Sequence, residues 1–195
     1  MNQPEVILFG GCNGAGKTTL AFQLLGKGLQ LYEFVNADEI ARGLNPLNPS
    51  AQAGLASRLS IQRVQTLIEQ KQPFSFEATL AGAWQAKMLT HCAKAGYQTR
   101  LIYVWLPSVA LAKQRVQNRV RQGGHDVPTT LIERRYHKGL ANLHRLYLPI
   151  VDEALILDGS ELGLSAHHRI IAQKHDEHID VIIPEKWSLI CQSKP

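Results

Sequence analysis

The sequence is poor in cysteine and contains no long hydrophobic run. Its three cysteines, Cys12, Cys92 and Cys191, are widely spaced and form no C-x-x-C pair, which argues against a disulfide framework and for a reducing, cytoplasmic environment. No run of about eighteen apolar residues occurs, so neither a membrane span nor a membrane partner is expected. The N-terminus leads almost directly into a short apolar stretch and leaves no room for a signal peptide.

Internal repeats, low-complexity segments and flexible linkers are also missing. The chain is 45% hydrophobic and 19% charged, as in ordinary globular proteins, and its 195 residues suit one domain over residues 1–195. The formal net charge of +5 favours anionic partners, which include nucleotides and nucleic acids.

A glycine-rich segment near the N-terminus is the most informative feature that is present. Residues 11–18, GCNGAGKT, fit the pattern G-x-x-x-x-G-K-[ST] of a phosphate-binding loop. In such a loop the glycines let successive backbone N–H groups turn toward phosphate oxygens, the lysine pairs with the β- and γ-phosphates, and the hydroxyl ligates Mg²⁺. We therefore predict nucleotide binding by Gly11, Asn13, Gly14, Ala15, Gly16, Lys17, Thr18 and Thr19, with Thr18 as the metal ligand.

The flanking sequence supports this interpretation. Residues 5–9 are an apolar run typical of a buried parallel strand, and residues 19–25 predict a helix with an apolar stripe. A strand, a glycine loop and a helix in this order are the setting that the loop requires, and the positive end of the helix dipole adds to the attraction for phosphate. ATP with Mg²⁺ is the predicted ligand, and a glycine-rich turn without a ligand is the alternative.

Strand and helix signals alternate along the rest of the chain. They predict strands over residues 33–36, 73–77, 100–106, 154–157 and 179–183, and helices over 50–70, 84–95, 109–122, 132–143 and near the C-terminus. This alternation predicts an α/β fold of the P-loop NTPase class, a doubly wound, mainly parallel sheet with helices on both faces. Ligands of such folds gather at the carboxyl ends of the strands, so the residues that follow strands are the candidates for chemistry.

Polar side chains follow the second and third of these strands. Asp38 is predicted to accept a proton from an attacking hydroxyl or to hold Mg²⁺ through water, and its alternative role is to cap the next helix. Glu77 and Thr79 are predicted to bind hydroxyl groups of a substrate. Their alternative is a solvated carboxylate and a helix cap.

Arginines gather on two predicted helices around a glycine turn. Arg115 and Arg119 lie four residues apart on the first helix, and residues 122–128 form a hinge-like turn. The second helix carries three more cations, Arg134, Arg135 and Lys138. Such a hairpin, over about residues 108–145, is typical of a lid that brings guanidinium groups onto a phosphoryl group and excludes water. A solvated basic face is the alternative.

Two other groups have the composition of functional sites. Cys12 lies inside the phosphate loop and is interpreted as a small residue that fits the turn; the alternative is a redox-sensitive thiol whose pKa is lowered by nearby positive charge. The residues at 175–178, HDEH, have metal-binding side chains but no partner cluster nearby, which favours a solvated turn.

Taken in order, several segments resemble the zeta toxin family of P-loop kinases. After the phosphate loop these segments are residues 34–38 (FVNAD), 76–80 (FEATL), 119–128 (RVRQGGHDVP), 134–136 (RRY) and 142–143 (NL). They look most like the small single-domain members described as predicted ABC-type ATPases or kinases. The chain has no L-S-G-G-Q signature, and the resemblance spans about residues 6–158.

The resemblance implies ATP-dependent phosphorylation of a hydroxyl on a small molecule, which in zeta toxins is a UDP-linked amino sugar. It implies that Lys17 and Thr18 serve the phosphates and Mg²⁺, that Asp38 is the general base, and that Glu77 and Thr79 bind the acceptor. It also implies an antitoxin protein as a partner. The alanine before Asp38 and the missing arginine after Thr79 differ from the toxic proteins on the acceptor side.

The lid arginines are matched less closely by the resemblance. Arg115 or Arg119 corresponds to the first phosphate-binding arginine, and Arg134 to the second, with His125 as an alternative. We predict that Arg119 and Arg134 act with Lys17 and Asp38 in catalysis and that Arg115 binds the nucleotide. Residues 158–160 resemble the segment near the adenine.

Two other functions stay open at this point. An ATP-binding regulatory or interaction module would use the phosphate loop without an acceptor. A nucleic-acid-end kinase would use the net positive charge, although nucleic acid is the less favoured partner.

Overall fold

The computed structural model describes residues 3–25, 33–124, 126–160 and 169–192. Its strands are β1 (Glu5–Gly10), β2 (Glu33–Val35), β3 (Phe74–Ala78), β4 (Gln98–Trp105), β5 (Glu153–Asp158), β6 (Arg169–His175) and β7 (His178–Val181). Its α-helices are α1 (Lys17–Leu25), α2 (Ala37–Leu44), α3 (Ala53–Glu69), α4 (Trp84–Lys94), α5 (Val109–Arg121), α6 (Thr129–Asn142) and α7 (Pro184–Gln192). A 3₁₀ turn, η1 (Pro49–Gln52), precedes α3, and a π-helical turn, η2 (Leu143–Tyr147), continues α6.

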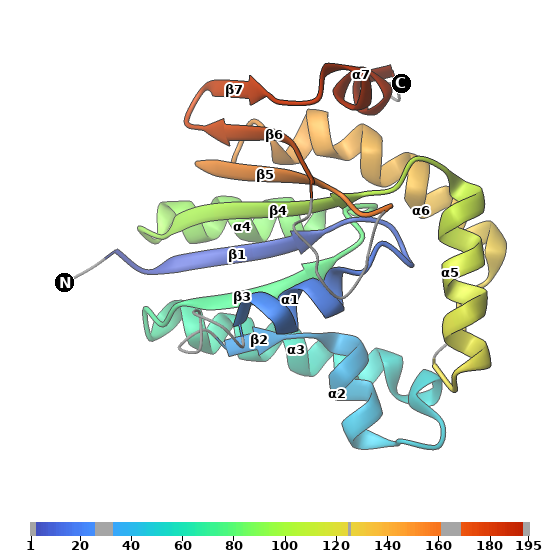
Figure 1. The fold of residues 1–195 in the computed structure, drawn as a ribbon. Helices are drawn as coiled ribbons and strands as arrows, with labels where there is room; N and C mark the ends of the chain where they lie inside the picture. The colour runs from blue at the N-terminus through green and yellow to red at the C-terminus, as the bar shows by residue number, and fades with distance from the viewer. Residues whose placement is uncertain (1–2, 26–32, 125, 161–168, 193–195) are drawn as a thin grey trace.

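In the described part of the chain the strands form one seven-stranded sheet in the order β2-β3-β1-β4-β5-β6-β7 (Figure 1). The pairs from β2 to β5 are parallel, and β6 and β7 extend the sheet in antiparallel fashion. β1 lies inside the sheet between β3 and β4, and every residue of it is buried, as its apolar run predicts. The predicted doubly wound, mainly parallel α/β fold is therefore confirmed.

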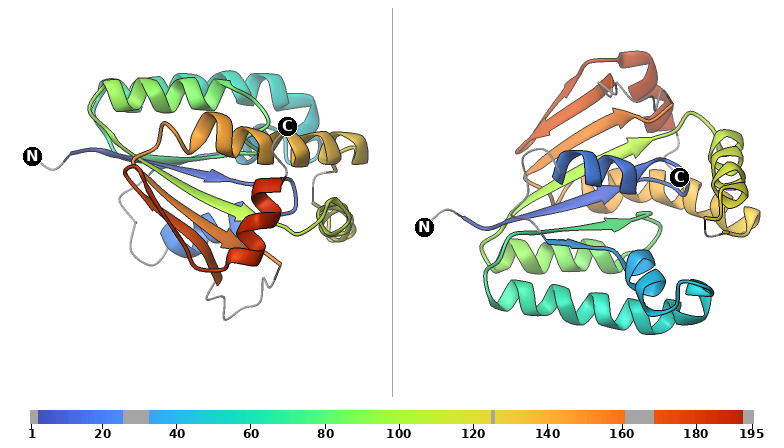
Figure 2. Two further views of the ribbon diagram at one scale, coloured as in Figure 1. Left: turned by 90° about the horizontal axis from the view of Figure 1, so that it is seen from above. Right: turned by 60° about the horizontal axis from the view of Figure 1, so that its bottom comes forward.

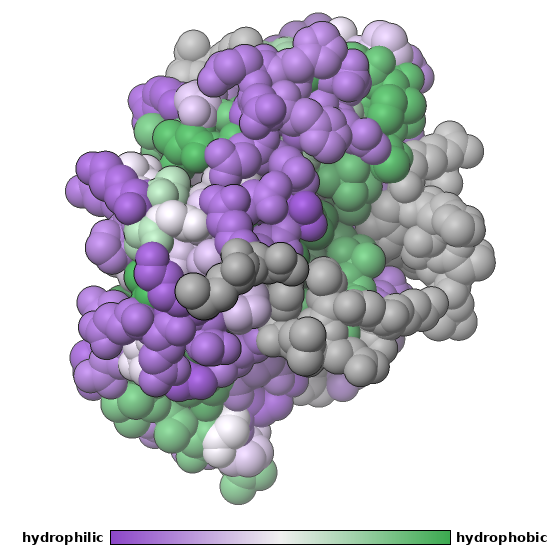
Figure 3. All heavy atoms as spheres, turned by 90° about the vertical axis from the view of Figure 1, so that its left-hand side faces the viewer, coloured by the Kyte–Doolittle hydropathy of each residue, from purple (hydrophilic) through white to green (hydrophobic). Residues whose placement is uncertain are grey.

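Helices cover both faces of this sheet (Figure 2). α3, α4 and α6 lie on one face, α1 and α7 lie on the other, and α5 stands beside the carboxyl ends of the strands. The side chains between these layers form one hydrophobic core. The phosphate loop, the segment after β3 and the start of α5 meet at the same end of the sheet, where a P-loop fold binds its ligand. Figure 3 views the opposite end, where mostly hydrophilic residues cover the described surface.

Two elements differ from the sequence-based expectation, and the turn expected at residues 175–178 is present. β6 was not predicted, because its apolar core is only the three residues 170–172 between polar neighbours. The segment at 175–178 forms the tight turn between β6 and β7, in which Asp176 has a φ of +52°. The helix expected over 50–70 is divided into η1 and α3, since Asn48 caps η1 and Pro49 begins it.

Within the described residues, none of the helices combines the length and the hydropathy that a membrane crossing requires.

Candidate functional site

The phosphate loop joins β1 to α1 and needs glycine at two of its turns. Gly11 has a φ of +142°, and a Cβ atom there would lie 2.4 Å from the carbonyl oxygen of Val104 at the end of β4. Gly14 has a φ of +79°, and a Cβ atom there would lie 2.8 Å from the carbonyl oxygen of Ala112 in α5. The loop is thus packed between β4 and α5 in a shape that other residues cannot adopt.

Lys17 is the buried cation of the loop. Only 6% of its side chain is exposed, and its Nζ donates to the carbonyl oxygen of Cys12 at 3.0 Å. The same Nζ lies 3.5 Å from Oε1 of Glu77. A buried ammonium group is stable only with such partners, so the loop holds a positive charge ready at its centre.

Glu77 is the acid that faces this charge. β3 runs parallel to β1 with Glu77 opposite Phe9, which brings the carboxylate beside the start of the loop. Its Oε2 accepts a hydrogen bond from the Thr18 hydroxyl at 2.6 Å and one from Nδ2 of Asn36 at 3.2 Å. Glu77 is therefore tied to both functional side chains of the loop.

The Thr18 hydroxyl and the Glu77 carboxylate form the oxygen donor set that Mg²⁺ prefers. These residues fit the ion that a bound triphosphate carries. Sequence reasoning assigned Glu77 to the acceptor, because the residue type alone does not tell which neighbour its strand will have. Among the described residues no cluster of three or more His, Cys, Asp or Glu side chains with metal-binding geometry occurs.

Asn36 is a residue of the site that the sequence did not single out. Its Oδ1 accepts hydrogen bonds from the backbone N–H groups of Asp38 at 2.8 Å and Glu39 at 3.3 Å, so it caps α2. The capping role considered for Asp38 therefore belongs to Asn36, whose amide also reaches Glu77. The signal that predicts this is the Asn at the end of β2, two residues before an acidic first turn.

Asp38 lies in the first turn of α2 with an exposed side chain. Its negative charge acts on the guanidinium of Arg135 from the lid region. Asp38 therefore stands on the α2 side of the site opening, whereas Glu77 lies deeper, against Lys17.

Arg135 of α6 is an arginine of the lid region whose side chain contacts the phosphate loop. Its Nη1 donates to Oδ1 of Asn13 at 3.3 Å. Partial burial lowers the pKa of Arg135, and the charge of Asp38 opposes this shift. The predicted residues Arg119 and Arg134 are exposed, and His125 lies outside the described residues. One step along a helix turns a side chain by about 100°, and this phase favours Arg135 over Arg134 at the loop.

Arg115 lies on the other side of the loop, on α5. Its Nη1 and Nη2 donate to the carbonyl oxygens of Gly159 at 2.6 Å and Ser160 at 2.8 Å. Arg115 thus links α5 to the segment after β5 that is expected near the adenine.

Asp158 anchors the same segment. Its Oδ1 accepts hydrogen bonds from the N–H group and the hydroxyl of Ser160, and its Oδ2 pairs with Lys186 of α7. Burial alone raises the pKa of Asp158, but the hydrogen bonds from Lys186 and Ser160 outweigh it and hold that pKa below its ordinary value.

Thr79 lies where β3 leaves the sheet. Its carbonyl oxygen packs so closely on α6 that a Cβ atom at Gly139 would lie 2.7 Å from it. Asn142 donates to the carbonyl oxygen of Leu80 at 2.8 Å, and Leu80 has a φ of +58°. α6 therefore fixes the segment that connects Glu77 to α4.

Of the two interpretations of Cys12, the structure supports the small residue that fits the turn and contradicts the lowered thiol pKa. Its side chain is 4% exposed, and burial raises the pKa of the thiol to about 11 even though Lys17 and Arg115 lower it in part. The cost of placing a thiolate in the core exceeds the attraction of the two cations, so Cys12 is a small core residue of the loop.

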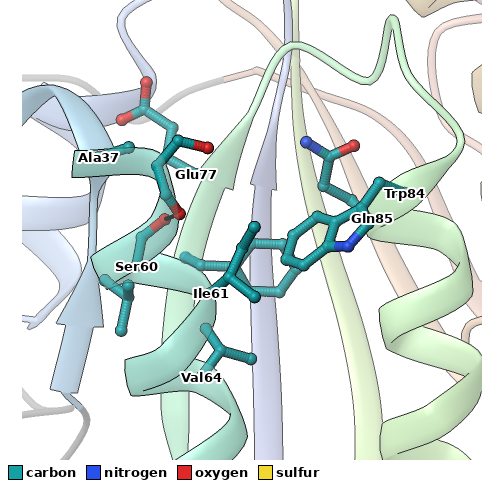
Figure 4. A pocket seen from close by; sticks show the side chains of 10 residues that line it. Ala37, Ser60, Ile61, Val64, Glu77, Trp84 and Gln85 are labelled. Atoms are coloured by element: carbon teal, nitrogen blue, oxygen red, sulfur yellow. Dashed lines mark hydrogen bonds between the residues drawn. The ribbon is translucent and has the colours of Figure 1, made fainter. Parts of the chain in front are cut away.

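A cavity of about 280 Å³ opens next to Glu77 (Figure 4). Its walls come from the ends of β2 and β3 and from α2, α3 and α4. It is lined by Val35, Ala37, Ser57, Ser60, Ile61, Val64, Phe76, Glu77, Trp84 and Gln85. Glu77 thus stands between the phosphate loop on one side and a space for a second ligand on the other.

The model of a known protein family, described as AAA domain, matches residues 6–145. The chain belongs to this family. The match includes the phosphate loop, Asp38, Glu77 and all of α5 and α6, and it ends before β5. An uncharacterised protein of Haemophilus influenzae is 29% identical over 134 residues, which are 69% of this chain and 94% of that protein.

Solved structures share the fold at low sequence identity. A chain of the PezAT toxin–antitoxin system of Streptococcus pneumoniae has a TM-score of 0.67 at 15% identity, over 100% of this chain and 79% of that one. The AvrRxo1-ORF1:ORF2 complex with ATP has a TM-score of 0.78 at 17% identity, over 99% of this chain and 65% of the other. The chain therefore shares its fold with these proteins, and the resemblance noted in the sequence holds at the level of the fold.

Proposed function

We propose that the chain is an ATP-dependent kinase that transfers the γ-phosphoryl group to a hydroxyl of a small molecule. The observation that carries this proposal is Glu77, which joins Lys17 and Thr18 of the phosphate loop and also lines the neighbouring cavity. Direct phosphoryl transfer requires an acceptor held next to the nucleotide, and a cavity that borders the phosphate loop at Glu77 meets this requirement. A nucleotide-binding module without an acceptor has no need for the second space.

Each part of the site has a role in such a transfer. The loop amides and Lys17 would hold the phosphates of ATP, and Thr18 and Glu77 would hold Mg²⁺, which supplies charge neutralisation. Asp38, at the site opening, would accept the proton of the attacking hydroxyl. Arg135 would place its guanidinium on the transferred group in place of Arg134, with Arg119 as a further candidate in the lid over about residues 108–145.

The comparisons support the proposal in general terms. The AvrRxo1-ORF1:ORF2 complex, which shares the fold, contains ATP, and this supports ATP as the proposed nucleotide of this chain. The PezAT system is a toxin–antitoxin pair, so an antitoxin is a candidate partner for this chain as well. A UDP-linked amino sugar is the acceptor that the zeta toxin resemblance suggests.

Incubation with γ-labelled ATP, Mg²⁺ and a pool of cellular metabolites tests this function. The expected result is a labelled organic phosphate whose formation needs both the protein and Lys17. Label in inorganic phosphate alone would contradict the kinase and favour the regulatory module. Labelled oligonucleotide ends, together with an oligonucleotide affinity that falls steeply with salt, would instead favour the nucleic-acid-end kinase.

Replacing Arg135 with alanine is expected to lower kcat about a hundredfold, since it removes a donor that faces the phosphate loop. Arg134→Ala is the matched control. Arg134 is the residue next to Arg135 and is exposed, so its replacement removes the same charge without removing a contact to the loop. Its kcat is expected to stay within about threefold of the unmodified protein. The kcat values of both variants are measured by steady-state kinetics with the acceptor that the labelling experiment identifies. A larger loss of kcat for Arg134→Ala than for Arg135→Ala would return the role to Arg134.

A further inference from the structure

The cavity beside Glu77 has an unusual lining for a site next to a phosphate loop. Glu77 is the one ionisable side chain among the described residues that line it, and the lining includes neither lysine nor arginine. Phosphate groups are normally recognised by those two residues, so this space offers little to an anionic ligand. The Glu77 carboxylate makes a second negative charge still less favourable.

The apolar side of the cavity is built for a flat group. The ring of Trp84, at the start of α4, points toward Ile61 of α3, and Val64 lies beside them (Figure 4). Trp84 is 44% exposed, which is a large exposed fraction for the biggest apolar side chain. A ring that slides between Trp84 and Ile61 would cover this surface and gain both burial and stacking.

The volume sets an upper size. About 280 Å³ lies just below the range of about 300–1,000 Å³ that small-molecule sites usually occupy. A ring with a short polar arm fits this space, whereas a diphosphate-linked sugar with its nucleoside exceeds it.

Resting on the proposed function, we propose that the acceptor is an uncharged alcohol with a flat ring. The ring packs against Trp84 and Ile61, and the alcohol points toward Glu77 and the phosphate loop. In the reaction the alcohol oxygen forms a bond to the γ-phosphorus, the bond from that phosphorus to the β,γ-bridging oxygen of ATP breaks, ADP leaves, and the alcohol proton passes to Asp38. This substrate class excludes acceptors that already carry phosphate.

Matched pairs of nucleosides and nucleoside 5′-monophosphates test the charge rule, because the members of each pair share their ring and differ in the phosphate. The indole N–H resonance of Trp84, assigned with a Trp84→Phe variant, is followed by NMR during titration without ATP. At least one nucleoside is expected to shift this resonance and to bind tenfold or more tightly than its monophosphate. Equal or tighter binding of the monophosphates, or no shift with any nucleoside, overturns the proposal.

Two substitutions on α3 supply the second arm of the test. Ser60→Arg places a cation in the cavity wall and is expected to weaken nucleoside binding at least tenfold, whereas Gln65→Arg adds the same charge on the exposed side of α3 and is expected to change it less than twofold. Trp84→Ala, at a half-exposed position where folding is not at risk, is expected to give a loss similar to Ser60→Arg. ATP affinity should be unchanged in all three variants.

The binding arm and the transfer arm separate this inference from the kinase proposal. A nucleoside that binds at Trp84 but receives no label from γ-labelled ATP would contradict the kinase and leave a neutral ligand site. Label found only in anionic acceptors would keep the kinase and overturn the inferred substrate class.

Discussion

Replacing Lys17 with alanine is expected to lower kcat for phosphoryl transfer by about a thousandfold or more and to weaken ATP binding as well. Lys17 is the buried cation at the centre of the loop, where a charge acts in a low dielectric and faces the phosphates at close range. Without it the loop has only its amides to neutralise the triphosphate, and Glu77 adds uncompensated negative charge. Initial rates with the acceptor and calorimetric ATP titration measure the two effects.

Lys113→Ala is the matched control for this substitution. Lys113 forms an ion pair with Glu133 near the surface of α5 and α6, away from the loop, so its loss is expected to change kcat less than twofold. Since Lys17 also balances Glu77 in the fold, circular dichroism and thermal unfolding are recorded for both variants, and Lys17→Arg keeps the charge. A folded Lys17→Ala variant with near-normal turnover would contradict the role of the loop.

The second large effect is expected for Asp38→Asn. If Asp38 is the base, this change removes a proton acceptor without changing the size of the side chain, and kcat should fall about a hundredfold to ten-thousandfold. ATP affinity should stay within about threefold, because the phosphate loop is untouched. Single-turnover transfer and ATP binding, measured on the same protein, separate the two quantities.

Glu39→Gln provides the neighbouring control. Glu39 follows Asp38 on α2 and pairs with Arg42 on the exposed side of the helix, so its replacement is expected to leave kcat within about twofold. Turnover of Asp38→Asn near the normal rate would show that the base is elsewhere. Glu77 would then be the next carboxylate to test, since it lies deeper in the site and borders the cavity.

Much of the fold was predictable because local patterns fix it. The apolar run of β1 and the glycine pattern predict a strand and a loop that are buried and turned as observed. Predicted helices alternate with the strands from β2 to β5 along the sequence. This alternation suffices to predict a parallel sheet. β6 escaped prediction because a short strand at an antiparallel edge depends on its partner more than on its own sequence.

The site was predictable as a set of residues but not as a set of contacts. The roles of Lys17 and Thr18 can be predicted from their spacing to the glycines alone, because this spacing places both side chains at the phosphates in a phosphate-binding loop. Glu77 was expected beside the acceptor, and the pairing of β3 with β1 also ties it to Thr18. Which arginine faces the loop depends on the rotation of α6 against the sheet, and that rotation brings Arg135 to Asn13.

The sequence by itself determined that a phosphate loop follows a buried strand in a parallel α/β sheet, because glycine conformations, hydrophobic runs and their order along the chain are local properties. Only the tertiary structure decided that Glu77 and Asn36 meet at the loop, that Cys12 is a buried and inert thiol, and that a cavity without cations lies beside them. Those features arise where segments far apart in the chain pack together. Burial, charge pairing and the shape of a cavity depend on neighbours that no single segment contains.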